Sequence, residues 1–157
     1  MKRFAVFALA CIALIHPGGA QAQPSTCGPA GRESATKLHV DVEGVRSNDG
    51  LVAVTLYADD SKRFLASRGS LYVARVPAKA GTTRVCIYLP EPGVYALAVY
   101  HDADGNRKIN RSAIGLPTEA VGFSNNPRLF LSIPSFRAVR LSVPESDMVT
   151  GVRLRYP

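Results

Sequence analysis

Residue types that commonly build metal centres and recognition surfaces are scarce in this chain. Its 157 residues include no tryptophan, three cysteines and three histidines. A zinc centre needs three or four converging ligands, most often cysteine and histidine, so none is predicted. Lysine and arginine form no run longer than two residues, although the formal charge is +7. A nucleic-acid-binding surface is therefore not expected.

Sequence signatures of catalysis are missing as well. The chain has no G-x-S-x-G nucleophile elbow and no glycine-rich phosphate loop. A nucleophile also needs an oriented base beside it, and no pattern in the sequence indicates such a pair. The sequence favours a non-catalytic protein, and a small hydrolase using His101 and Asp102 is the enzymatic alternative.

Only one long apolar run is present, and it stands at the N-terminus. Lys2 and Arg3 precede apolar residues 4–15, and the small-residue tripeptide Ala20–Ala22 follows. This order is typical of a secretory signal peptide. About a dozen apolar residues are too few to span a bilayer, which takes roughly 20, so no transmembrane segment is expected. We predict a signal peptide at residues 1–22, cleavage after Ala22, and a periplasmic or secreted protein.

The predicted mature chain keeps 135 residues, enough for one domain. We divide it into a polar leader, 23–36, and one folded domain, 37–157. Cys27 and Cys86 remain, and an even cysteine count in an exported protein indicates a disulfide. This disulfide would close a loop of about 60 residues and stabilise the fold by at most about 4 kcal/mol. A free Cys86 packed in the core is the alternative.

Apolar and polar residues alternate with period two along most of the domain, as in strands with one buried face. The predicted strands are residues 38–43, 51–57, 71–76, 82–89, 94–100, 136–143 and 149–156, with 129–133 as a further short edge strand. Residues 94–100 are apolar on both faces, which is typical of a central strand. The Asp49-Gly50 step predicts a hairpin between the first two strands.

Turn residues separate these segments, and helical periodicity is almost missing. One short helix is predicted at 62–68, between the acidic residues Asp59 and Asp60 and a glycine stop at Gly69. About seven short strands with turn signals between them predict an all-β fold, a single antiparallel two-sheet sandwich. A small closed barrel is the architectural alternative.

Oxygen-bearing side chains recur at short spacing directly after the predicted central strand. Such spacing in a tight loop can bring several oxygens to one calcium ion. The candidate calcium ligands are Asp102, Asp104, Asn106 and Asn110. The calcium-loop motif is incomplete because glycine comes fourth and Ala113 stands where a glutamate is expected, but Glu119 is a candidate from the far side of the loop. Turns in which Asp and Asn bond their own backbone, with no cofactor, are the alternative.

The loop region resembles a known bacterial family. Residues 89–106 read L-P-x-P-G-x-Y-A-x-A-V-x-H-D-x-D-G-N, and residues 115–126 read G-x-P-x-E-x-x-G-F-S-N-N. These segments are similar to domain-of-unknown-function family 2141, and the similarity extends over about residues 38–156. The resemblance implies a small exported sandwich, immunoglobulin-like or transthyretin-like, with no established activity. The family more often has glycine at Arg107 and aspartate at Asn110, which would weaken a metal site here.

Loops 101–111 and 115–126 are longer and richer in polar residues than a turn requires, which favours a binding role. The candidate binding residues are His101, Asp102, Asp104, Asn106, Glu119, Phe123, Ser124 and Asn125. The expected partner is a protein or a glycan of the cell envelope, and a calcium-stabilised structural module is the second hypothesis. The alternative for Phe123 is that it plugs the end of the sandwich, with residues 124–126 in capping turns. The alternative for His101 is a hydrogen bond to neighbouring backbone or to Asp102.

Overall fold

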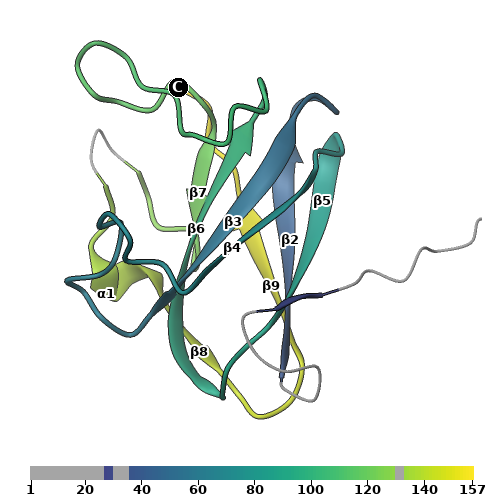
Figure 1. The fold of residues 1–157 in the computed structure, drawn as a ribbon, viewed down its shortest axis with the longest axis vertical. Coiled ribbons are helices and arrows are strands. Elements are labelled where there is room, and N and C mark those ends of the chain that lie inside the picture. The colour runs from purple at the N-terminus through teal and green to yellow at the C-terminus, as the bar shows by residue number, and fades with distance from the viewer. Residues whose placement is uncertain (1–26, 30–35, 130–132) are drawn as a thin grey trace, which may run out of the picture.

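The computed structural model describes residues 27–29, 36–129 and 133–157, which form two β-sheets packed face to face (Figure 1). The first sheet has the order β1 (Gly28–Pro29), β5 (Gly81–Tyr88), β2 (Lys37–Val45) and β9 (Met148–Arg153). The second has the order β4 (Tyr72–Pro77), β3 (Leu51–Ala58), β6 (Gly93–Asp102) and β7 (Val121–Phe123), and β8 (Arg140–Val143) also pairs with β6. The predicted all-β two-sheet sandwich is confirmed.

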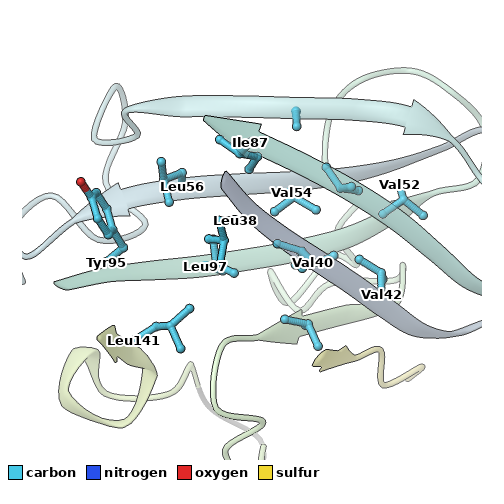
Figure 2. Packing of buried hydrophobic residues seen from close by; sticks show 14 of the residues in the cluster. Leu38, Val40, Val42, Val52, Val54, Leu56, Ile87, Tyr95, Leu97 and Leu141 are labelled. Atoms are coloured by element: carbon cyan, nitrogen blue, oxygen red, sulfur yellow. The ribbon is translucent and has the colours of Figure 1, made fainter. Parts of the chain in front are cut away.

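The inner faces of the two sheets form the main core. Apolar side chains at alternate positions of β2, Leu38, Val40 and Val42, are fully buried against Val54 and Leu97 of the second sheet (Figure 2). The period-two pattern of the sequence places all of them on one face of each strand. Burying each such side chain contributes roughly 1.5–3 kcal/mol, so this layer is the main source of stability.

Most neighbouring strands are antiparallel, as predicted, but β2 pairs with β9, and β1 with β5, in parallel. The predicted hairpin between β2 and β3 is wrong, because these strands lie in different sheets. The connecting loop passes from the first sheet to the second, where the Gly50 carbonyl accepts the Ala78 N–H at 3.1 Å and extends the β3–β4 pairing. Gly50 has φ +66, and a Cβ there would lie 1.9 Å from the Asp102 carbonyl oxygen, so the crossing requires glycine.

The helix predicted at 62–68 is not formed. This segment makes single hydrogen-bonded turns, and Leu65 and Arg68 have φ of 58° and 59°, which no right-handed helix accommodates. The helix of the described residues is α1 (Phe136–Val139), in the first half of the segment predicted as a strand. The single helical turn directs Phe136 and Val139 toward the same apolar cluster. The second half of the predicted strand is formed and is β8.

A second apolar cluster covers part of the outer face of the second sheet. Tyr57 of β3, Ala96 of β6, Phe123 of β7 and Val139 of α1 are buried there. Phe64 joins them from the 59–70 loop, with its ring 5.3 Å from Tyr57 in an edge-to-face contact. β6 pairs with β3 on one edge and with β7 and β8 on the other, so the predicted central strand is confirmed.

The predicted disulfide between Cys27 and Cys86 is present and attaches the short edge strand β1 to β5. The predicted signal peptide, residues 1–22, most of the predicted leader, and residues 130–132 of the predicted edge strand lie outside the described residues. In the described part of the chain, no helix is long and apolar enough to cross a membrane.

Candidate functional site

The long loops between β6 and β7 project from one end of the sandwich, near the C-terminus, as the green ribbon in Figure 1 shows. Asp102 is the last residue of β6, and the chain returns to that strand at β7. Two hydrogen bonds join Asn110, in the middle of the connection between β6 and β7, to residues near its end. The Thr118 N–H donates to the Asn110 carbonyl at 2.9 Å, and the Asn110 N–H donates to Glu119 Oε2 at 3.0 Å.

Three carboxylates meet where these loops join. Asp102, Asp104 and Glu119 each offer an oxygen within 4.8 Å of the other two. Asp102 has 0% of its surface exposed. Its Oδ2 accepts the Arg107 N–H at 2.8 Å, but Asp102 Oδ1 and Glu119 Oε1 are buried without a hydrogen-bond partner. The structure therefore brings together two of the predicted calcium ligands and Glu119, the additional candidate from the far side.

The other two predicted ligands, Asn106 and Asn110, surround Asp104. Both side-chain amides donate to Asp104 Oδ2 at 2.8 Å, and the Asn106 N–H donates to Oδ1 at 3.1 Å. These bonds, with that of Asn110 first, hold the pKa of Asp104 below its ordinary value. Asn106 Oδ1 also accepts the Lys108 N–H at 2.7 Å. Asp104 and Asn106 thus form the backbone-bonded turns that the sequence allowed as an alternative.

His101 points away from this cluster. It precedes Asp102 in β6, and consecutive strand residues face opposite sides of a sheet. In the neutral ring, Nε2–H donates to the Asp49 carbonyl at 2.9 Å and Nδ1 accepts the Tyr156 hydroxyl at 3.1 Å. The ring is 3% exposed. His101 therefore bonds distant parts of the chain, and the bond to Asp102 that a hydrolase pair would use is not formed.

The second predicted loop segment has a structural role in the described chain. Phe123 is buried in the outer cluster, and Ser124 is fully buried. Ser124 Oγ accepts the Leu97 N–H at 3.0 Å and donates to the Val139 carbonyl, which links β6 to α1. Asn125 is exposed and donates to the Arg140 carbonyl at 2.7 Å. Burial removes Ser124 from direct contact with a large partner.

An apolar groove lies beside the loops, and it was not predicted from the sequence. It has a volume of about 950 Å³, and its floor includes Tyr57, Ala98 and Tyr100 on the outer face of the second sheet. Leu116 of the loop and Ile133 form part of its walls, and they are 41% and 63% exposed. Two features of the sequence could have indicated it: the apolar residues on both faces of β6, and the apolar residues 109 and 116 within polar loops.

Fold and site together define a two-sheet β-sandwich with an acidic loop and an apolar groove at one end. The family model DUF2141, described as an uncharacterized protein conserved in bacteria, matches residues 40–150. The chain belongs to this family, as the resemblance of its loop sequences indicated. No curated protein and no solved structure matches the chain.

Proposed function

We propose that the chain is an exported, non-catalytic binding module of the cell envelope that holds an apolar segment of a partner protein. The binding surface is the groove bordered by loops 101–111 and 115–126. The exposed apolar walls of this groove are the observation that carries the proposal.

Apolar side chains gather in the groove while the surrounding loops are polar. Leu65, Leu116 and Ile133 line it and are 37%, 41% and 63% exposed. Grouped exposed apolar residues in a concave surface are typical of interaction sites. The volume of about 950 Å³ is at the upper end of the roughly 300–1,000 Å³ of ligand pockets, and an extended peptide segment needs this room.

The charges on the groove favour one kind of partner. Arg111 and Arg155 line it and are exposed. Besides these two arginines, Glu119 and Thr55, the lining is aliphatic and aromatic, which suits apolar side chains better than a glycan. A segment with apolar residues next to acidic ones would therefore complement the surface in shape and charge.

Export is supported by two features. Residues 1–22 have the order of a signal peptide, and Cys27 and Cys86 form a disulfide of the kind that persists in oxidising compartments. N-terminal sequencing of the protein recovered from the periplasm or medium should begin at Gln23. Recovery of the uncleaved chain from the cytoplasm alone would contradict export.

Site-specific photocrosslinking in cells tests the binding role. A photoreactive amino acid replaces Leu116 in the groove or, as the matched control, Val149, which is 62% exposed on β9 of the other sheet. We expect a discrete protein crosslink at Leu116 only, weakened by Arg111→Glu. The crosslinked peptide should be apolar with acidic neighbours. The same products from both positions, or no crosslinked protein at Leu116, would refute the role of the groove.

A further inference from the structure

Two buried carboxylate oxygens at the loop junction have no partner. Asp102 Oδ1 and Glu119 Oε1 accept no hydrogen bond, and Asp102 is completely inaccessible to solvent. A buried charged group is normally paired, fully hydrogen-bonded or bound to a metal. Neither oxygen has any of these partners within the described protein, so the junction lacks a positive group.

No side chain of the described residues supplies that positive group. The ion pairs there join other residues, and none includes Asp102, Asp104 or Glu119. Arg107 and Lys108 contribute only backbone donors, to Asp102 and Asn106 respectively, and the Arg111 guanidinium donates to the Gly115 carbonyl at 2.8 Å. The side chains of Arg107, Lys108 and Arg111 are exposed to solvent.

We propose that Asp102, Asp104 and Glu119 bind one calcium ion, which fixes loop 101–111 against loop 115–126. Only oxygen donors are present in the cluster, and oxygen ligands select hard cations. Calcium bonds of roughly 2.3–2.6 Å allow ligand oxygens to lie up to about 5 Å apart. The three carboxylate oxygens all lie within 4.8 Å of one another, which is compatible with this span.

Asn106 and Asn110 hold Asp104, one of the three metal-binding carboxylates, in position. Their amides hold Asp104 Oδ2 from two sides at 2.8 Å. Hydrogen bonds of this kind fix the orientation of a metal-binding carboxylate. The remaining coordination positions are open to backbone carbonyls and water, as in other calcium sites in loops.

Thermal melting with and without calcium is the first test, on the full mature chain with its disulfide intact. Calcium at about 10 mM should raise the melting temperature by roughly 5 °C, because a Kd near 10⁻⁴–10⁻³ M is usual for extracellular modules. Glu119→Gln and Asp104→Asn should weaken binding in calorimetry by roughly tenfold or more. Glu145→Gln removes an exposed carboxylate between β8 and β9 and is the matched control.

Terbium luminescence separates ion binding from a purely structural role. Tyr100 lies close enough to Asp102 and Glu119 for both carboxylates to raise its pKa, although burial is the largest cause. The chain has no tryptophan, so excitation of tyrosine should sensitise bound Tb³⁺. Calcium should displace the signal, and Tyr100→Phe should reduce emission while the calcium-induced melting shift persists.

Asp102→Asn gives a further distinction, since it removes a buried charge. This variant should melt at least as high as the wild type without calcium and should no longer respond to the ion. Calcium that produces neither a melting shift nor displaceable Tb³⁺ emission would overturn the proposal. A shift that survives Glu119→Gln and Asp104→Asn unchanged would do the same. Glu119 also lines the groove, but the crosslinking at Leu116 is a separate readout that uses neither calcium nor the metal-site variants, so each proposal can fail while the other stands.

Discussion

Hydrogen-bond donors decide which oxygens of the acidic loop remain available. Asp104 is the most heavily bonded, because two asparagine amides and one backbone N–H reach it. Asp102 and Glu119 each give one oxygen to a backbone N–H and keep the other free. An aspartate at position 110 would have no amide to donate to Asp104, so Asn110 suits a positioning role better than a ligand role.

The ion pair between Asp41 and Arg84 gives a prediction for pH dependence. Arg84 bonds both oxygens of Asp41, at 2.6 and 2.9 Å, and this bond holds the pKa of Asp41 below its ordinary value. The unfolded carboxyl titrates near about 3.9. The stabilising contribution is therefore complete above that pH and is lost as pH falls through the lower folded pKa.

We expect Asp41→Asn to lower the urea midpoint slightly at pH 7, since the Arg84 side chain is 61% exposed and Asp41 is only partly buried. The difference from the wild type should shrink as pH decreases below about 4. Urea unfolding from pH 7 to pH 2 measures it. A difference that stays constant over this range would mean that Asp41 acts through something other than its charge.

Single-residue roles were predictable from the sequence where the partners are local. The backbone-bonded turns of Asp104 and Asn106 follow from spacings of two residues. The partners of His101 lie 52 and 55 residues away in the chain. No local pattern identifies such partners, because they depend on how the sheets meet.

At the level of elements, the period-two pattern identified the strands but failed where tertiary contacts override local preference. Residues 62–68 have helix signals at both ends, but only Phe64 has a large apolar partner surface, in the outer cluster. Residues 136–139 are the start of a segment predicted as a strand, and they form a helical turn because Phe136 and Val139 both face that cluster. Local propensity is a weak guide when one aromatic contact outweighs it.

Ser124 holds β6, β7 and α1 together, and its removal tests this link. Ser124→Ala leaves the buried Leu97 N–H and Val139 carbonyl without their partner. We expect a loss of about 1–3 kcal/mol in the free energy of unfolding. Ser142→Ala, at an exposed position of β8, is the control and should change stability by less than about 0.5 kcal/mol. Equal urea midpoints for the two variants would rule out the linking role.

At the scale of the molecule, the sequence predicted which residues face the core but not which strands pair. The alternating pattern is the same whether β2 lies beside β3 or, as observed, between β5 and β9. The crossing at residues 46–50 depends on contacts with Ala78 and His101 that the Asp-Gly step does not encode. The groove depends likewise on how the loops lie over the outer face of the second sheet.

The disulfide acts on the whole molecule, because it joins residues 59 apart in the sequence. Its main effect is to restrict the unfolded chain, and Cys27→Ser should lower the free energy of unfolding by up to about 4 kcal/mol. The core strands β2, β3 and β6 do not include the bridge, so the variant should keep the native β-sheet circular dichroism spectrum. Urea unfolding of the oxidised wild type, the reduced wild type and Cys27→Ser measures the effect. The reduced wild type and Cys27→Ser should have the same free energy of unfolding. A variant as stable as the oxidised wild type would show that the disulfide does not stabilise the fold.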